Sequence, residues 1–469
     1  MLKLNIKIVL SLCFLTIGIL GWSQESKSAQ NHLDKYWNYR TRLINYFVKP
    51  GPHIGESELA YVRNVYRRSE KGFTVGDQTI DLAWYIGILA TEYRLLSDNN
   101  QNTDNTLKEL NYALMAFDRL DRCETYPPWN KAKDTLDGFF HRYDLDLEYH
   151  PEHFSIIGRN KDLTSKDTWG TREPGVPTFI SRYDSDGNPN PYAASESQDQ
   201  LVHLLMGYSL VYKCLPDSEL SFYDNHLQKQ KVNFSKKAKL TVNRMISYLL
   251  AGPDWIIKDP NGDNVERGAN ALMYAYPLAA IGKRITGKSY DNTWSQSFWA
   301  KKLWGLSRIP NWVNDYNSTM ALTLAALTDT WWDITPLGKI NGTGFYIDKC
   351  GSPWNRETFY LLLFQFINDK QTSSYDKEKV LHQIDSAPFN GPYYWSQDSL
   401  KFKCCGMQAG KPLGGWAYPN KFRGTKKEQE GLGKYPTTGN FSGIDYMLLY
   451  NLYQLVEHPI PYKKSSIKD

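Results

Sequence analysis

Apolar residues in this chain recur every three or four positions over long stretches, which is the spacing of one face of an α-helix. The clearest patterns predict helices over 79–97, 106–121, 196–214, 233–251, 268–286, 317–331, 356–368 and 443–457. Weaker patterns add 30–48, 57–68 and 294–304. Clear alternation of apolar and polar residues, which is typical of half-buried strands, is absent from the sequence. The pattern therefore predicts an all-α fold.

Several of these helices are apolar around most of their circumference, and such helices need neighbours on more than one side. They also follow one another in pairs: 79–97 with 106–121, 196–214 with 233–251, and 268–286 with 294–304. Long loops rich in Gly, Pro and Trp separate them, at 122–195, 305–316, 333–355 and 385–442. Ordered loops of this length on a rigid scaffold commonly build a functional site. We therefore expect helical hairpins layered into a ring, with the site formed by the loops.

The N-terminus has the pattern of a secretory signal. Lys3 and Lys7 precede an apolar run from Ile8 to Gly21, and the small residue Ser23 stands before a polar chain. The run is shorter than the about 20 residues of a membrane-spanning helix, and no later stretch is apolar enough to span a membrane. We expect cleavage near Ser23 and a periplasmic or secreted location. Residues 24–469 then form one domain, because no Ser/Gly-rich or Pro-rich linker divides them.

Charge and known motifs exclude several classes of function. The formal net charge of +5 falls by two when Lys3 and Lys7 leave with the signal segment, which is too low a charge to indicate nucleic-acid binding. The chain has no phosphate-binding loop, no dinucleotide-binding fingerprint and none of the common zinc motifs. The sequence therefore predicts neither a nucleotide cofactor nor a catalytic metal.

One segment resembles the start of a calcium loop. Asp184, Asp186 and Asn188 have the spacing of calcium ligands. However, Pro189 stands where an EF-hand needs glycine, and Ser195 stands where it needs glutamate. An ordinary Asp/Gly/Asn turn is the better interpretation, so no structural cation is expected.

Paired helices, an export signal and aromatic-rich loops between helices resemble the (α/α)-toroid carbohydrate-active enzymes. That group includes many polysaccharide lyases and several glycoside hydrolase families. The resemblance is architectural and extends loosely over residues 30–457. It implies a toroid, or incomplete barrel, of helical hairpins with long inter-helix loops, and a polysaccharide or oligosaccharide substrate.

The most informative candidate site is the start of the helix at 196–214. On a helical wheel of about 100° per residue, its polar residues share one narrow face, whereas apolar residues cover the rest. The polar stripe consists of Glu196, Asp199, Gln200 and His203. Such a stripe is costly in a dry core, so it favours a water-filled cavity, where Asp199 and His203, four residues apart, would support proton transfer. The alternative is a buried polar network, or acids that complement the helix N-terminus.

Two loop segments add groups suited to acid–base chemistry. The first carries His141, Arg142, Tyr143 and Asp144, and the second carries Asn314, Tyr316 and Asn317. Cleavage of a uronate-containing chain by β-elimination needs a group that neutralises the carboxylate, a base for the C5 proton and an acid for the leaving oxygen. Arg, His, Asn and Tyr suit these roles. The alternatives are a salt-linked surface turn in the first segment and an N-cap in the second.

Aromatic residues supply candidate sugar-binding surfaces. Asp81, Trp84 and Tyr85 share a face of the helix at 79–97, although core packing around a paired acid explains that pattern equally well. In the loops, Tyr394, Trp395 and Trp416 form two further aromatic groups. The whole chain contains 15 Trp and 32 Tyr, which agrees with stacking on sugar rings but also with aromatic cores.

Together these patterns predict a secreted polysaccharide-degrading enzyme, foremost a lyase that acts on a uronic-acid-containing glycan. His203, Asp199, His141, Arg142, Tyr143 and Tyr316 are the candidate catalytic residues, and the other residues named above would bind substrate. Two alternatives remain open. One is a glycoside hydrolase in which Asp199 is paired with Asp81 or Asp144, and the other is a glycan-binding protein without activity.

Overall fold

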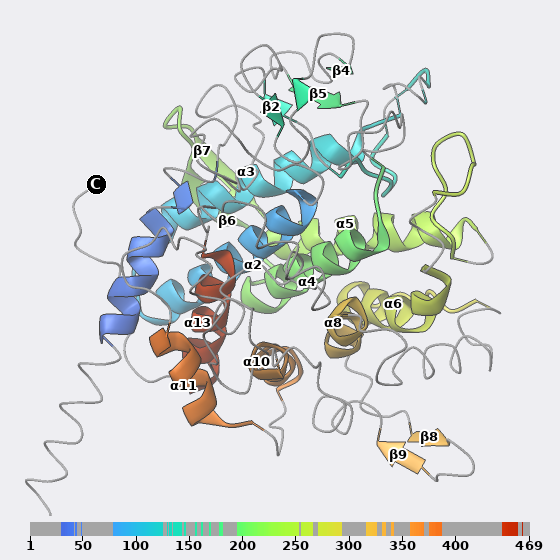
Figure 1. The fold of residues 1–469 in the computed structure, drawn as a ribbon. Coiled ribbons are helices and arrows are strands. Elements are labelled where there is room, and N and C mark those ends of the chain that lie inside the picture. The colour runs from blue at the N-terminus through green and yellow to red at the C-terminus, as the bar shows by residue number, and fades with distance from the viewer. Residues whose placement is uncertain are drawn as a thin grey trace, which may run out of the picture.

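The computed structural model is mostly helical, as the apolar pattern predicts (Figure 1). The structure describes residues 30–41, 43–44, 48, 78–124, 129, 131–133, 135–142, 145–146, 155–156, 161–162, 168–169, 178–181, 195–252, 255–265, 271–292, 316–325, 331–333, 339–341, 357–369, 375–386, 443–457 and 462. The signal segment at 1–23 and the weaker helices at 57–68 and 294–304 lie outside these residues. Among the described helices, none combines the length and the apolar character needed to cross a membrane.

The long helices agree closely with the apolar pattern. An N-terminal helix at 30–41 precedes α2 (Gln78–Asp98), α3 (Asp104–Asp121), α4 (Gln198–Cys214), α5 (Phe234–Leu250), α6 (Ala271–Thr286), α8 (Tyr316–Ala325), α10 (Glu357–Asn368), α11 (Lys377–Ser386) and α13 (Ile444–Glu457). Helix α11 is absent from the sequence prediction because its charged sequence, KEKVLHQIDS, has few apolar positions. The prediction for 317–331 is too long, since Trp331 already belongs to a strand. Thr328, Asp329 and Thr330, which precede it, are weak helix formers.

Short antiparallel sheets lie outside the helical body. The strands are β1 (Leu145–Asp146), β2 (Ser155–Ile156), β3 (Lys161–Asp162), β4 (Thr168–Trp169), β5 (Thr178–Ser181), β6 (Leu220–Tyr223), β7 (Lys229–Val232), β8 (Trp331–Asp333) and β9 (Lys339–Asn341). They pair in the order β1-β5-β4, with β2-β3, β6-β7 and β8-β9 as separate ribbons. Strands of two to four residues are too short for alternation to be recognised in a sequence.

The helices contact one another in two layers (Figure 1). A closed circuit of neighbours runs from α2 to α4, α8, α10, α13 and back to α2. Around it, α3 contacts α2, α5 contacts α4, α6 contacts α8, and α11 contacts α13. Residues of α2, α4 and α13 are buried almost throughout, whereas α3 and α5 bury one side. This confirms the prediction that the fully apolar helices have neighbours on several sides.

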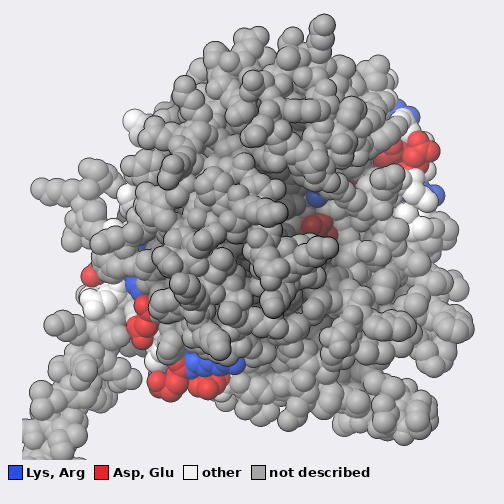
Figure 2. Space-filling view, in the orientation of Figure 1, with Lys and Arg blue, Asp and Glu red and all other residues white. Residues whose placement is uncertain are grey.

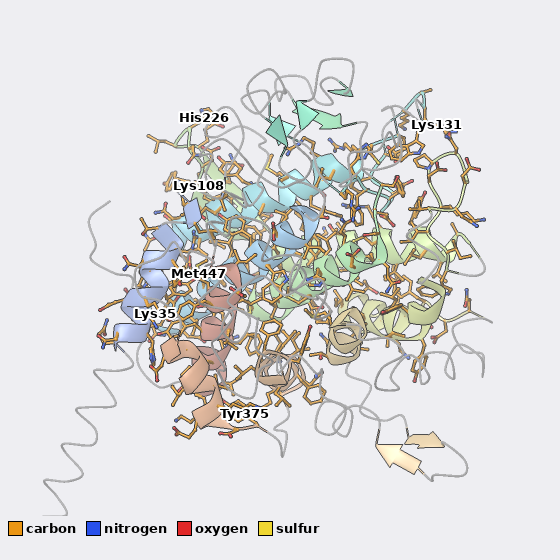
Figure 3. The ribbon with its side chains drawn as sticks, in the orientation of Figure 1. Lys35, Lys108, Lys131, His226, Tyr375 and Met447 are labelled. Atoms are coloured by element: carbon orange, nitrogen blue, oxygen red, sulfur yellow. The ribbon has the colours of Figure 1, made fainter. Side chains whose placement is uncertain are left out.

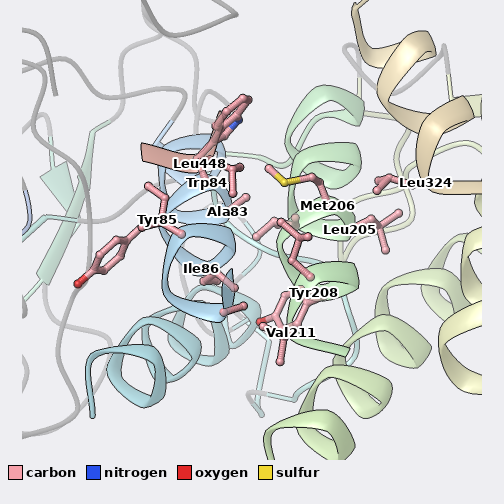
Figure 4. Packing of buried hydrophobic residues seen from close by; sticks show 14 of the residues in the cluster. Ala83, Trp84, Tyr85, Ile86, Leu205, Met206, Tyr208, Val211, Leu324 and Leu448 are labelled. Atoms are coloured by element: carbon pink, nitrogen blue, oxygen red, sulfur yellow. The ribbon is translucent and has the colours of Figure 1, made fainter. Parts of the chain in front are cut away.

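Helices α2 and α4 approach each other closely (Figure 4). A Cβ atom added to Gly207 would lie 2.6 Å from the backbone oxygen of Ala83. The two helices therefore touch backbone to backbone at this point, and only glycine fits there. Gly87, one turn further along α2, faces a methyl group of Leu210 instead.

We expect Gly207→Ala to lower the free energy of unfolding by about 1–3 kcal/mol, because the new methyl group meets a backbone atom and forces α2 and α4 apart. Gly87→Ala is the matched control. Its methyl group meets the end of a flexible side chain, and the better helix propensity of alanine offsets the contact. Urea unfolding of both variants measures the difference, and equal stability of the two would contradict a backbone-limited contact.

A buried ionic network joins the N-terminal helix to α2 and α3. The Arg40 guanidinium donates from Nε to Glu92 Oε2 at 2.8 Å and from a terminal nitrogen to Glu109 Oε2 at 2.8 Å. Glu92 also accepts hydrogen bonds from the hydroxyls of Tyr36 at 2.5 Å and Thr106 at 2.7 Å. Its carboxylate is thus satisfied on both oxygens, as a buried charge requires.

Candidate functional site

The segment at 139–142 ties together the starts of α2 and α4. The backbone N–H of Thr79, in the first turn of α2, donates to the carbonyl oxygen of Arg142 at 3.1 Å. The backbone N–H of Phe140 donates to Oε2 of Glu196, just before α4, at 3.2 Å. Because both helices begin beside this segment, they run in the same direction. Their N-termini, each with partial positive charge, therefore converge here.

A short polar relay then crosses the first turn of α4. The Arg142 guanidinium donates to the hydroxyl oxygen of Ser197 at 3.1 Å, and that hydroxyl in turn donates to Asp199. The backbone N–H of Ser197 donates to Oε1 of Gln200 at 3.1 Å, which completes a capping box. Gln200 thus caps the helix, in agreement with the structural alternative for that residue. Ser197 was not among the predicted site residues, although its S-x-x-Q spacing with Gln200 is a recognisable signal.

The imidazole of His203 has a fixed orientation. The indole N–H of Trp84 on α2 donates to Nδ1 of His203 at 2.8 Å. Phe359 of α10 stacks on the indole of Trp84, with 4.8 Å between the ring centroids. An imidazole nitrogen that accepts a hydrogen bond carries no proton, so the neutral ring of His203 has its proton on Nε2. His203 is therefore arranged as a hydrogen-bond donor rather than as a base.

The ring of His141 is covered by an aromatic neighbour. Trp129 lies over it at 4.9 Å between ring centroids, and Phe139 meets Trp129 edge to face at 5.0 Å. The Trp129 indole N–H is held by Oδ2 of Asp259 at 3.0 Å. A β-bridge between His141 and Ser195 fixes the backbone beside α4. Trp129 was not predicted as part of the site; its only sequence signal is the Pro-Pro-Trp run that it ends.

Glu196 lies at the buried centre of a group of acids. Burial, together with the nearby carboxyls of Asp121 and Asp137, raises the pKa of Glu196 well above its usual value, against the opposing Phe140 N–H bond. Burial likewise raises the pKa of Asp137 to about 6. Burial also raises that of Asp121 to about 7, although Arg244 opposes the shift. The carboxyl of Glu196 is therefore held toward its protonated form.

The pH dependence of stability tests this assignment. A carboxyl whose pKa is raised on folding contributes fully to stability below its unfolded pKa of about 4.3, and the contribution is lost as the pH rises through the folded value. Each such proton changes the free energy of unfolding by up to about 1.4 kcal/mol per pH unit. We expect Glu196→Gln, which mimics the protonated acid, to equal the wild type near about pH 4 and to exceed it at neutral pH. Thermal unfolding across this range is the measurement, and the same change at exposed Glu219 is the control. A variant that is less stable at neutral pH would contradict the assignment.

The side chains of this cluster are almost completely buried. Trp84, His141, Glu196 and His203 are each at most 1% exposed, whereas the side of Asp199 is partly open. The water-filled cavity that we expected along the polar stripe is therefore not open at His203. Figure 2 shows the described charges of one face as small groups of mixed sign, one of them recessed near the middle of the view. Among the residues of this cluster, only Asp199 is partly exposed.

Other predicted residues lie apart from the cluster or are not described. The hydroxyl of Tyr85 donates to Glu109, in the network of Arg40, and its ring points away from α4 in Figure 4. Asp81 is buried in the first turn of α2. Tyr316 and Asn317 open α8, which contacts α4, but their side chains are not described. The predictions that fall outside the described residues are Tyr143, Asp144, Asn314, Tyr394, Trp395, Trp416 and the turn of Asp184, Asp186 and Asn188.

The structure thus brings residues of three predicted segments together: Trp84 on α2, His141 and Arg142 on the connecting segment, and Glu196, Asp199 and His203 at the start of α4. Within the described residues, no group of three or more His, Cys, Asp or Glu is placed to hold a metal ion. Comparison of the chain with protein-family models, with curated proteins and with solved structures finds no match.

Proposed function

We propose that this chain is an exported polysaccharide-degrading enzyme that cleaves a uronic-acid-containing glycan by β-elimination. The observation that carries the proposal is the convergence of two helix N-termini, Arg142 and the imidazole of His203 beside one connecting segment. Helix N-termini and cations favour an anionic group. The carboxylate of a uronate is such a group.

The arrangement of the helices supports a toroid. The circuit of α2, α4, α8, α10 and α13 closes on itself, and other helices pack outside it. Helices of an inner ring that run in the same direction bring their N-terminal loops to one end. In our proposal this end, with α2, α4 and the opening turn of α8, carries the substrate-binding face.

The residues take distinct parts in the proposed reaction. His203 is buried in this structure, so the proposed reaction requires the cluster to open on the side of Asp199. The Nε2–H of His203 then donates to the uronate carboxylate, which makes the C5 proton more acidic, and Trp84 holds the ring in place. His203 does not serve as the base, because its Nδ1 lone pair is already used by Trp84. We assign the removal of the C5 proton and the protonation of the leaving oxygen to Tyr143 and Tyr316. Arg142 adds a positive charge beside this group, and its guanidinium is held by the hydroxyl of Ser197, which in turn donates to Asp199.

The chemistry of the products tests the proposal directly. Purified mature protein would be incubated with alginate, ulvan and glucuronan, and both the ultraviolet absorbance of unsaturated uronates and the number of new reducing ends would be followed. β-Elimination yields one unsaturated end and one reducing end for each bond broken, so we expect both signals to rise together. Absence of both signals across the panel would contradict an enzymatic function and leave glycan binding.

A glycoside hydrolase is the second candidate, and one observation favours it. The raised pKa of Glu196 is the property that a hydrolase requires of its general acid. Asp199, three residues later, would be the second carboxylate. In the same assay a hydrolase produces reducing ends without unsaturated uronates, so the two reactions are distinguished in a single experiment.

A further inference from the structure

The β6–β7 hairpin presents a face with an unusual set of exposed side chains. The inner face of the ribbon is anchored by Phe222, which is buried and contacts the ring of Phe234 at 6.0 Å between centroids. The outer face carries Ser221 and Tyr223 from β6, with Lys231 and Lys229 directly opposite them on β7. The Tyr223 ring thus shares one face of the ribbon with two lysines, one directly opposite and one diagonal to it.

The tip of this hairpin is rigid although it is exposed. Oδ1 of Asp224 accepts hydrogen bonds from the backbone N–H groups of His226 at 2.9 Å and Gln228 at 2.8 Å. Its Oδ2 accepts from the side-chain amide of Gln230 at 2.7 Å. The negative charge of Asp224 is therefore engaged in ordering the turn. Figure 3 places His226 at the outer edge of the molecule.

Packing does not account for two of the apolar residues of the hairpin. Tyr223 is 52% exposed and Leu227 is 82% exposed. Leu227 also has a φ of 58°, a left-handed conformation that costs a leucine about 1–2 kcal/mol. The turn itself requires this conformation: the backbone N–H of Leu227 donates to the carbonyl oxygen of Asp224 at 3.1 Å, as in a type I turn followed by a left-handed residue. The exposed ring of Tyr223, by contrast, is required by neither the turn nor the core.

We propose that the outer face of β6–β7, with Tyr223, Lys229 and Lys231, is a surface binding site for an acidic polysaccharide. The ring of Tyr223 receives the apolar C–H face of a sugar, and the two lysines pair with carboxylates or sulfates on the same chain. Lys229 and Lys231 are two positions apart on one strand, about 6.8 Å, which suits repeated charges along a polymer. The site holds the protein on its polymer, and it does so whether or not the cluster at α4 is catalytic.

Charge and shape favour a glycan over a lipid surface. Within the described hairpin only Tyr223 and Leu227 are large, apolar and exposed, and polar His226 and Gln228 stand beside Leu227 at the tip. Insertion into a membrane needs a larger continuous apolar area. A flat aromatic ring beside two cations fits a ribbon-like anionic chain better.

Native gel electrophoresis with alginate cast into the gel tests this site, with dextran as the neutral polymer. We expect alginate but not dextran to retard the wild type, and added salt to weaken the effect because exposed charges are screened. Tyr223→Ala/Lys229→Ala should bind alginate roughly fivefold more weakly, since it removes the ring and one exposed ion pair. The matched control is Leu240→Ala/Lys236→Ala, which changes an exposed leucine and an exposed lysine of α5 instead. It should be retarded like the wild type.

A second variant keeps the test independent of folding. Lys229→Glu/Lys231→Glu leaves Tyr223 and the turn intact, and circular dichroism confirms its fold; it should lose most of the retardation. The proposal would be overturned by a wild type that alginate does not retard, by hairpin variants that bind like the wild type, or by binding to phosphatidylglycerol vesicles in place of alginate. Cleavage of short soluble oligosaccharides should be the same in wild type and variants, so a failure at the hairpin is separable from a failure of the proposed reaction.

Discussion

Replacement of Arg40 by methionine should lower the free energy of unfolding by about 3–5 kcal/mol, because it leaves buried acids without their cation. Arg40 is the cation that Glu92 and Glu109 share, and it contributes three of the hydrogen bonds that hold them. Burial opposes the charged guanidinium, but Glu109 and Glu92 raise the pKa of Arg40 above its ordinary value. The methionine side chain fills much of the space of the arginine stem, so the loss reports mainly the missing charge.

The Arg94–Asp98 pair provides a matched control on the same α2 helix. Its members are 2.7 Å apart but nearly half exposed, so the pair contributes at most about 1 kcal/mol. Arg94→Met should therefore be close to the wild type in a urea titration, while Arg40→Met unfolds at much lower urea. Equal midpoints for the two variants would show that the Arg40 network does not stabilise the fold as described.

The second large effect concerns activity. His203→Ala should reduce kcat on an acidic polysaccharide by roughly 100- to 1000-fold, the usual loss when one donor to a developing charge is removed. Trp84→Phe keeps the imidazole but removes the indole N–H that orients it, so a smaller loss of roughly tenfold is expected in kcat, with KM little changed. Initial rates and circular dichroism on the same preparations separate catalysis from folding.

Tyr85→Phe tests the division of α2 into two sides. Although Tyr85 follows Trp84 in the sequence, its hydroxyl contacts Glu109 on the other side of the helix. We therefore expect kcat/KM to stay within about twofold of the wild type, because a side chain that does not contact the substrate contributes nothing to binding of the transition state. A loss of activity as large as that of Trp84→Phe would instead restore the original prediction that Tyr85 binds substrate.

The helical body was predictable because its signal is local and repeated. In α2, α4 and α13, apolar residues cover nearly every side, and this pattern predicted both their boundaries and their burial. Helix α11 was not predicted because its sequence, KEKVLHQIDS, has too few apolar residues to show a helical period. The β6–β7 hairpin escaped because four-residue strands with a mixed pattern carry little periodic information.

The candidate site was predictable only in part, because its contacts join residues far apart in the chain. The polar stripe of α4 identified His203 and Glu196, but a helical wheel does not show that Trp84 donates to His203. The same limit applies to Trp129 over His141. Tyr85 shows the opposite error. The helical wheel placed it on one face with Trp84, but that face is wide enough for the two neighbouring side chains to contact different networks.

In the proposed reaction Trp84 fixes His203 as a donor toward an anionic sugar, and nitrogen-15 NMR of the histidine rings tests this arrangement most directly. The chain has nine histidines, and comparison with His203→Ala identifies the signals of this ring. At neutral pH we predict an unprotonated, hydrogen-bonded Nδ1 and a protonated Nε2, whose signal shifts when a borohydride-reduced alginate oligosaccharide is added. A protonated Nδ1, or an Nε2 signal that does not respond to the oligosaccharide, would contradict the account.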